Sequence, residues 1–280
     1  MGLAAISYDP PEILAEFARR YSITFPLLSD AGSATIKAYG ILNTLADEVL
    51  AGKNDPVLMD EFARYGSATG PNAARIVQGT PYPGTFMLDQ NGRVTARYFE
   101  DFYRERVTAS TILMRVGADS EPVEATKISA AHVRITTYPS DPVIAPGNRF
   151  ALAIRIEPDS RVHVYAPGAQ GYRPVKLDLT AQPLVRFVPL DYPASEIYFF
   201  KPLNERVPVY QKPFTLLQEA VLDASPQAAK ALAGQTSMTL TGVLHYQACD
   251  DKECFNLVSV PMSWTLKLKP SITERIRNGR

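Results

Sequence analysis

The hydrophobic positions in the first third of the chain follow two spacings in turn. Leu3–Ile6 and Phe25–Leu28 are short apolar runs, long enough only for strands. Apolar residues then recur at helical spacing, first after Pro10 and again in Ser33–Tyr39, which Gly40 can end. The first of these stripes consists of Ile13, Leu14, Phe17, Ala18 and Tyr21. Strands that alternate with helices predict an α/β layer.

A β-hairpin and a further helix complete this first segment. Gly84–Leu88 and Arg93–Phe99 flank Asp89-Gln90-Asn91-Gly92, whose Asn-Gly step is a strong hairpin signal. The pattern also predicts a helix from about Arg104 to Val116 and another from Pro56 to Tyr65, inside an irregular insertion. We therefore place an α/β domain at residues 1–118.

Beyond residue 118 both the composition and the hydrophobic period change. Residues 119–127 are mostly small or polar and include a proline, which is typical of a linker. From residue 128 the side chains alternate with a period of two, as in the run Phe150, Leu152, Ile154 and Ile156. Several such runs separated by Pro- and Gly-containing turns predict an all-β, immunoglobulin-like sandwich over residues 128–268. Residues 269–280 form a basic tail, to which we assign no function.

Charge and hydropathy exclude two classes of partner. The 280 residues contain 29 Lys and Arg against 29 Asp and Glu, so the chain has no net charge with which to hold a nucleic acid. No apolar run approaches the roughly 20 residues of a membrane-spanning helix, so no membrane span is expected. Met1–Ser7 has neither a basic region before it nor a cleavage site after it, and we expect no signal peptide here.

Four segments of the first domain carry a shared family pattern. They are Ala5-Ile6-Ser7-Tyr8-Asp9, Phe25-Pro26-Leu27-Leu28-Ser29-Asp30, Ala38-Tyr39-Gly40 and Pro83-Gly84-Thr85-Phe86-Met87-Leu88-Asp89. In this order they resemble the peroxiredoxin family, the AhpC/TSA or redoxin group. The resemblance covers about residues 1–116 and implies a thioredoxin-like fold.

The sequence departs from that family at its reactive cysteine. The family carries its peroxidatic cysteine in a strand and helix before the match to "AISYD", and residues 1–248 of this chain contain no thiol. Because peroxide reduction needs a thiolate, we expect no peroxidase activity. Thr80, Pro83 and Arg106, which would line the pocket in a complete family member, are interpreted as bystanders. The thioredoxin-like domain is thus expected to be incomplete, with residues 3–6 either paired directly to 84–88 or left apart from them.

The only two cysteines, Cys249 and Cys254, are separated by four residues at a junction between two alternating runs. They can close one short intrachain bridge, which adds little stability because its loop is short. A zinc site would need more ligands than this pair and His245 offer, and His245 is interpreted as an ordinary strand residue. The surrounding acidic residues disfavour an activated cysteine nucleophile, because negative charge raises a thiol pKa. This setting fits a disulfide that a partner's thiolate attacks.

A second family pattern surrounds the pair. "YQACDDKECF" at residues 246–255, with Val162–Gly168 and Val209-Tyr210 upstream, resembles the amino-terminal domain of the thiol:disulfide interchange protein DsbD, also described as the disulfide bond corrector domain. The resemblance implies an immunoglobulin-like fold that relays electrons from a thioredoxin-like domain to oxidised periplasmic partners. By the same resemblance, Cys254 forms the mixed disulfide and Cys249 resolves it. The residues implied at the partner-binding surface are Tyr165, Phe199, Phe200 and Tyr246, with the cap over the cysteines near Ile197–Val209. Phe199 and Phe200 fit the role of shields in this cap and that of ordinary core aromatics of a sandwich equally well.

These observations lead to one main hypothesis and two rivals. The main hypothesis is a thiol-disulfide oxidoreductase of the bacterial periplasm or cell envelope, by resemblance, which exchanges electrons through Cys249 and Cys254 with a thioredoxin-like redox protein or domain. No metal, nucleotide, haem or other cofactor is implied. The rivals are a non-catalytic protein-interaction scaffold with a structural disulfide, and a fragment of a full-length peroxiredoxin-type peroxidase.

Overall fold

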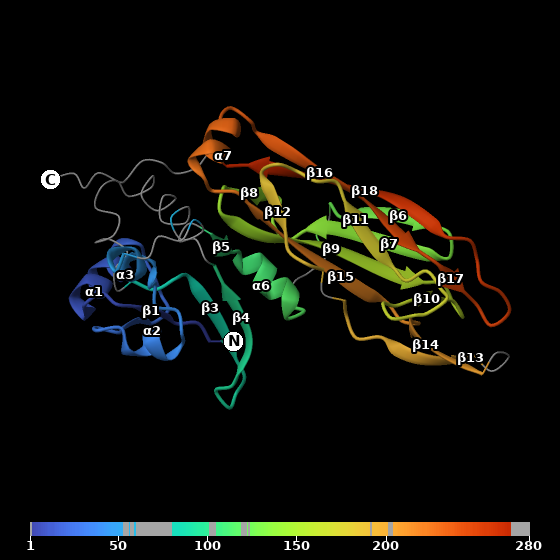
Figure 1. Cartoon of the computed structure of the whole chain (residues 1–280), viewed down its shortest axis with the longest axis horizontal. Helices are drawn as coiled ribbons and strands as arrows, with labels where there is room; N and C mark the ends of the chain where they lie inside the picture. Colours follow the sequence, from blue (N-terminus) through green and yellow to red (C-terminus); the bar gives the residue numbers. More distant parts are fainter. Residues whose placement is uncertain are drawn as a thin grey trace. The chain divides into compact units, whose positions relative to one another are not determined.

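A computed structural model describes residues 2–52, 56, 59, 80–100, 105–118, 122, 124–190, 192–200 and 204–269 (Figure 1). The chain forms two compact units, residues 1–104 and residues 105–280. The first is a mixed α/β region and the second consists mostly of β-strands, as the hydrophobic spacing predicted. None of the described helices is both long and apolar enough to cross a membrane.

The first unit contains short elements in the predicted order. Its described elements are β1 (Ala5–Ser7), α1 (Pro11–Arg20), β2 (Leu27–Ser29), α2 (Ala34–Ala38), α3 (Leu45–Leu50), β3 (Gly84–Leu88) and β4 (Val94–Phe99). The predicted helix at residues 56–65 falls almost wholly outside the described residues. The hairpin turn between β3 and β4 is held by the Asp89 carboxylate, which accepts hydrogen bonds from the backbone N–H groups of Asn91 and Arg93. Gly92 takes the left-handed conformation that this turn requires, with φ of 76°.

The described strands of the first unit form two separate pairs. β1 and β2 run parallel, whereas β3 and β4 are antiparallel. Among the described strands, residues 3–6 do not pair with 84–88, which is the second of the two expected outcomes. Asp30, which follows β2, anchors α2 because its carboxylate accepts the backbone N–H groups of Thr35 and Ile36 at 3.0 and 2.9 Å.

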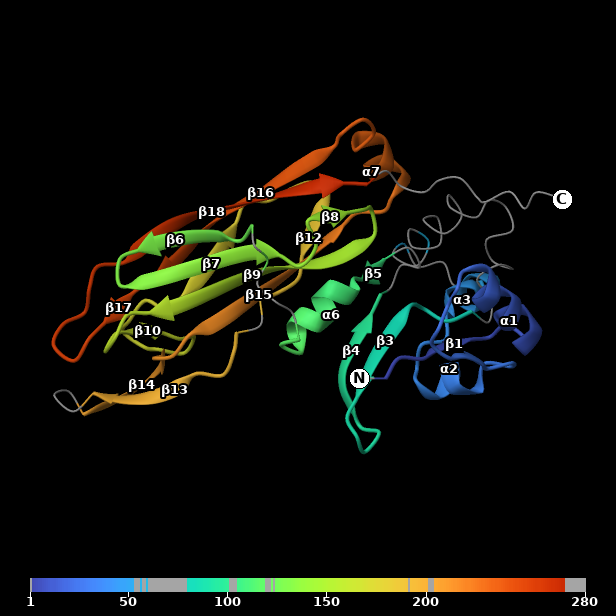
Figure 2. The same cartoon turned by 180° about the vertical axis from the view of Figure 1, so that it is seen from behind.

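The described strands of the second unit form three sheets (Figures 1 and 2). The first, ordered β12-β15-β9-β7-β6, consists of β12 (Val185–Phe187), β15 (Phe214–Leu222), β9 (Asn148–Pro158), β7 (Val133–Pro139) and β6 (Thr126–Ala130). The second, ordered β11-β16-β18-β8, consists of β11 (Lys176–Leu179), β16 (Ser237–Tyr246), β18 (Val258–Leu268) and β8 (Val143–Ile144). The third, ordered β13-β14-β10-β17, consists of β13 (Glu196–Phe200), β14 (Glu205–Tyr210), β10 (His163–Tyr165) and β17 (Ala248–Cys249). A short helix, α7 (Pro226–Ala231), lies between β15 and β16 in the chain.

The sandwich core lies between the first two sheets, and strand alternation creates it. Every second residue of β9 and β18 is buried in one cluster, including Leu152 and Ile154 from one sheet and Met262 and Trp264 from the other. The indole N–H of Trp264 donates to the Thr137 hydroxyl at 2.8 Å, which in turn donates to the backbone carbonyl of Ala153 at 2.6 Å. These bonds satisfy the buried indole N–H and the Thr137 hydroxyl, and the first of them joins the two sheets.

The segment before the linker differs from its expected place. β5 (Arg106–Val107) pairs with β9, and α6 (Ala109–Arg115) packs Met114 against Ala151 and Ala153 on the outer face of β9. Both therefore belong to the second unit, whereas the sequence placed residues 104–116 with the first domain. The small side chains of Ala151 and Ala153 leave room for α6 on this face of β9. Because alanines do not mark a strand face as buried, the sequence pattern of β9 does not predict this helix. Arg106, interpreted as a bystander of the first domain, lies in this segment.

Candidate functional site

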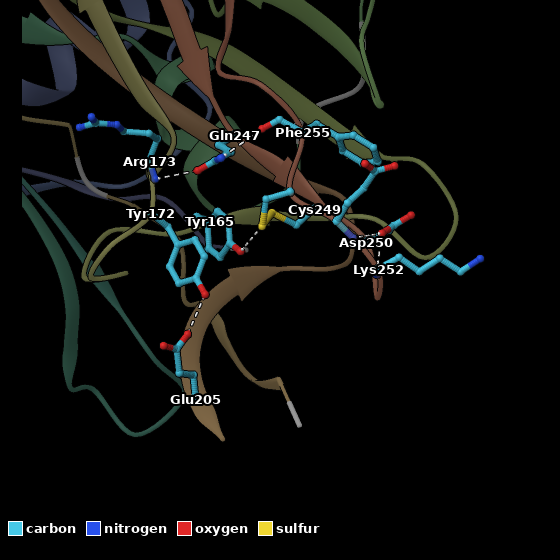
Figure 3. Close-up of a disulfide and its surroundings, with 11 residues drawn as sticks. Tyr165, Tyr172, Arg173, Glu205, Gln247, Cys249, Asp250, Lys252 and Phe255 are labelled. Atoms are coloured by element: carbon cyan, nitrogen blue, oxygen red, sulfur yellow. Dashed lines mark hydrogen bonds between the residues drawn. A yellow bond between two sulfur atoms is a disulfide. The ribbon is translucent and has the colours of Figure 1, made fainter. Parts of the chain in front are cut away.

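Cys249 and Cys254 form a disulfide at one end of the third sheet (Figure 3). Cys249 ends β17, where it lies opposite His163 of the antiparallel neighbour β10. The chain then turns through residues 250–253 and returns, so that Cys254 pairs back with Cys249 as an isolated bridge. The β-strand thus holds one sulfur rigidly, and a turn carries the other.

The Asp250 side chain shapes that turn. Its carboxylate accepts hydrogen bonds from the backbone N–H groups of Lys252 and Glu253 at 2.7 and 2.8 Å. These bonds, led by the one from Glu253, lower the pKa of Asp250 below its ordinary value. An aspartate that accepts hydrogen bonds from the backbone two or three residues ahead stabilises a turn. Asp250 therefore stabilises the turn that joins the two cysteines.

The two sulfur-bearing residues differ sharply in exposure. Cys249 is only 1% exposed, whereas Cys254 is exposed to solvent. A thiolate that approaches from outside therefore reaches Cys254 first. Because exchange occurs by attack on one particular sulfur, this difference distinguishes the two positions chemically.

Two stacked tyrosines border the disulfide. The Tyr165 hydroxyl lies 3.3 Å from the Sγ of Cys254, and its ring stacks on Tyr172 with centroids 4.2 Å apart (Figure 3). The Tyr172 hydroxyl donates to the Glu205 carboxylate at 2.7 Å. Burial raises the pKa of Tyr165 well above its ordinary value, so that its hydroxyl keeps its proton. Tyr165 therefore presents a hydrogen-bond donor to the exposed sulfur.

A hairpin formed by β13 and β14 completes a cleft of about 250 Å³ next to the disulfide. Tyr198, Phe200 and Val207 of this hairpin line the cleft. The Tyr198 hydroxyl donates to the Asp251 carboxylate at 2.7 Å, which links the hairpin to the cysteine turn. The described part of residues 197–209, where a cap over the cysteines is expected, is therefore a strand pair that this bond joins to the cysteine turn.

Two predicted site residues lie elsewhere. Phe199 is 42% exposed on the opposite face of β13 from Tyr198 and Phe200, with the Arg206 guanidinium over its ring. Tyr246 is fully buried in the sandwich core, where its hydroxyl donates to the Ala131 carbonyl at 2.6 Å. We therefore exclude both from the cleft. His245 lies on the other side of its strand, 2.8 Å from the Ser259 hydroxyl.

The cleft also contains residues that sequence reasoning missed: His163, Tyr172, Tyr198 and Val207. His163 and Tyr198 could have been found from the sequence. Each is two positions from a predicted site residue, Tyr165 and Phe200 respectively, and so lies on the same face of its strand. No local signal marks Tyr172, which lies in the loop after β10. The loop places its ring against Tyr165 only in the folded chain.

Gln247 explains part of the cysteine motif. Its side-chain carbonyl accepts the backbone N–H of Arg173, and its amide donates to the carbonyl of Phe255, both at 3.1 Å (Figure 3). Gln247 thereby ties the loop that carries Tyr172 to the residue that follows Cys254. Within the described parts of the chain, no group of three His, Cys, Asp or Glu side chains is arranged to hold a metal ion.

Comparison with known proteins identifies the first region. Residues 2–97 match the model of the AhpC/TSA family, so an AhpC/TSA domain precedes the β-sandwich. No curated protein matches the chain.

Two solved structures are similar to part of the chain. The N-terminal periplasmic domain of ScsB from Proteus mirabilis has 12% identity and a TM-score of 0.36, over 50% of this chain and 49% of that one. The N-terminal domain of DsbD from Neisseria meningitidis, in its reduced form, has 14% identity and a TM-score of 0.28, over 42% and 81%. The chain thus spans about half of the ScsB domain that it matches. Likeness at this level does not establish a function.

Proposed function

We propose that the β-sandwich exchanges dithiol and disulfide through Cys249 and Cys254 with a thioredoxin-like redox protein or domain. The observation that carries this proposal is the unequal exposure of a disulfide that borders an aromatic cleft. Cys254 is open to attack, and Cys249 is 1% exposed behind it.

The chemistry follows from that geometry. A donor thiolate attacks the Sγ of Cys254, a new sulfur–sulfur bond forms, and the bond to Cys249 breaks so that Cys249 leaves as a thiolate. The donor's second thiolate then attacks the donor sulfur of this mixed disulfide. The donor is thereby oxidised to a disulfide, and both cysteines of the protein are reduced and take up two protons.

The reverse sequence delivers the electrons. The Cys254 thiolate attacks an oxidised partner, and the Cys249 thiolate then attacks Cys254, which releases the partner as a dithiol. Two electrons move from this protein to the partner, and the Cys249–Cys254 disulfide forms again.

A purely structural role explains the arrangement less well. Closing a loop of six residues stabilises a fold by only about 2 kcal/mol in the chain-entropy model. A purely structural disulfide also does not require that one sulfur be exposed beside a cleft. The midpoint potential separates the two roles, because exchange pairs lie between roughly −270 and −180 mV and structural disulfides below about −300 mV.

The decisive experiment traps the mixed disulfide. Cys249→Ser is incubated with a thioredoxin-like protein that lacks its second active-site cysteine and carries its first as a mixed disulfide with glutathione. A covalent adduct at Cys254 is expected to accumulate with release of glutathione, because neither protein then has a resolving thiol. Cys254→Ser is expected to form none, since its remaining thiol is buried. Adducts at Cys249 alone would reverse the two roles, and the absence of adducts in both variants would contradict the exchange function.

We also place this activity in the periplasm or cell envelope. A protein that passes electrons to disulfides of other proteins works in a compartment where such disulfides persist, and they are rare in the cytosol. Cell fractionation with alkylation of free thiols tests this, and a pair found wholly reduced in the cytosol would contradict it.

A further inference from the structure

We propose that His163 accepts the thiol proton of Cys249 and so prepares Cys249 for the resolving step. This inference rests on the proposed exchange function and adds to it a proton acceptor. His163 was not among the site residues predicted from the sequence. The resemblance to the DsbD amino-terminal domain, which implied the roles of the cysteines, implied none for His163.

The backbone pairing brings the two residues together. His163 and Cys249 are directly opposite each other on the antiparallel strands β10 and β17. Side chains at such positions share one face of the sheet, with Cβ atoms about 4.5–5.5 Å apart. Both residues line the same cleft, and His163 is only 3% exposed. The two side chains therefore lie on one face of the sheet and border the same cleft.

Aromatic neighbours hold the imidazole in place. Its ring centroid is 4.6 Å from that of Tyr198 and 5.4 Å from that of Tyr165, which meets it edge-on at 86°. These rings come from β13 and from the same strand β10, so the imidazole is packed from two elements. A base held in one position beside a thiol loses little entropy when it takes the proton.

The charged groups around His163 suit a proton acceptor. Burial lowers the pKa of His163, whereas the carboxylates of Asp251 and Asp250 raise it. Burial is the larger effect, so the ring is neutral near neutral pH. The other titratable groups that line the cleft are Tyr165, Tyr172, Tyr198, Lys252, Glu253 and the two cysteines.

The same carboxylates then stabilise the product of proton transfer. Negative charge alone disfavours a thiolate, but it favours an imidazolium. When the proton moves from Cys249 to His163, the thiolate and imidazolium attract each other, and Asp250 and Asp251 support the cation. The acidic turn therefore opposes a lone thiolate and supports the ion pair.

In the resolving step, proton transfer precedes the attack on the mixed disulfide. His163 takes the proton of the Cys249 thiol, and the resulting thiolate attacks Cys254 of the mixed disulfide. The bond between Cys254 and the partner sulfur breaks, and the partner leaves as a thiolate that receives the proton from the imidazolium. Cys249 is oxidised, the partner sulfur is reduced, and His163 returns to its neutral form.

The test measures Cys249 without any partner, so its failure is distinct from a failure of the exchange function. In Cys254→Ser, the thiolate absorbance of Cys249 is titrated against pH, with the double cysteine variant as blank. His163→Phe in this background preserves the ring packing and removes the base. We expect the Cys249 thiolate fraction near neutral pH to fall about tenfold, which corresponds to about one unit of pKa. An unchanged titration curve would overturn the proposal.

His132→Asn is the matched control. His132 stacks on Phe255 near the same turn but is not paired with a cysteine, and asparagine tolerates its left-handed backbone. We expect this variant to leave the Cys249 titration unchanged, and an equal shift in both variants would overturn a specific role for His163.

A second measurement covers the case in which His163→Phe does not fold. The His163 ring is titrated by NMR in Cys254→Ser and in the double cysteine variant. Because coupling between two titrating groups is reciprocal, replacing the Cys249 thiol is expected to move the His163 pKa. Identical His163 curves would overturn the proposal.

Discussion

The hydroxyl of Tyr165 lies 3.3 Å from the Sγ of Cys254, the exposed sulfur of the disulfide. A disulfide sulfur carries no hydrogen, so the tyrosine is the donor of this contact. When the disulfide is reduced, the same hydroxyl faces a sulfur that can carry a negative charge. A hydrogen bond to an ionised acceptor is stronger than one to a neutral acceptor. Tyr165 is thus placed to favour the thiolate form of Cys254.

Replacing Tyr165 by phenylalanine tests this role. In a Cys249→Ser background, Tyr165→Phe is expected to raise the Cys254 pKa and to slow its alkylation near neutral pH about fivefold, the loss of roughly 1 kcal/mol. Alkylation rates measured across pH check this. Tyr210→Phe is the control, because its hydroxyl donates to the Pro193 carbonyl. Equal alkylation rates in the Tyr165 and Tyr210 variants would contradict the role of Tyr165 as a hydrogen-bond donor to Cys254.

The bond between Tyr198 and Asp251 is expected to limit access to the disulfide. Tyr198→Phe removes this bond between the β13–β14 hairpin and the cysteine turn, and we expect reduction by a small dithiol to become about threefold faster. Phe199→Leu, on the opposite face of β13, is expected to change nothing. The rate of disulfide reduction under a fixed dithiol concentration measures both, and a larger effect of Phe199→Leu would contradict the assigned cleft face.

Glu219 is expected to stabilise the folded sandwich through two ion pairs. Its side chain is 1% exposed and binds Arg115 of α6 and Arg149 of β9. Glu219→Gln removes the buried carboxylate that both arginines bind and is expected to cost roughly 3 kcal/mol of unfolding free energy. Trp264, the single tryptophan, lies in this core and reports unfolding by fluorescence. Glu157→Gln, which breaks exposed pairs, is expected to cost less than about 1 kcal/mol.

Asp30 is expected to make α2 sensitive to acid. The backbone N–H groups of Ile36 and Thr35 lower the pKa of this carboxyl in the folded chain. Its contribution is therefore present above the ordinary aspartate pKa and is lost as pH falls through the lower folded value. NMR titration of Asp30 and amide exchange in α2 check this. An Asp30→Asn variant whose α2 exchange keeps the same pH dependence as the parent would contradict it.

The chain is expected to show no catalytic peroxide consumption above that of free cysteine. Residues 1–248 contain no thiol, and a peroxidatic nucleophile must be a thiolate. Hydrogen peroxide loss, followed with excess reductant, measures this. Turnover that survives in the double variant Cys249→Ser with Cys254→Ser would contradict it.

Much of the fold was readable from the spacing of apolar residues. The period of two in β9 and β18 predicted which side chains fill the sandwich core, because alternate residues of a strand must face opposite sides. The Asn-Gly step predicted the β3–β4 hairpin for an equally local reason. In contrast, the packing of α6 on β9 depends on Ala151 and Ala153, whose small size is not a signal in the sequence.

The sequence alone determined that any exchange chemistry must use Cys249 and Cys254, because the chain has no other thiol. Only the tertiary structure decided which sulfur is exposed, since exposure depends on the neighbouring strand and hairpin. Tertiary packing also decided that Phe200 and Tyr198 face the cleft while Tyr246 is core. The register of β10 against β17 placed His163 beside Cys249, residues 86 positions apart. Such contacts join distant segments, and local spacing carries no information about them.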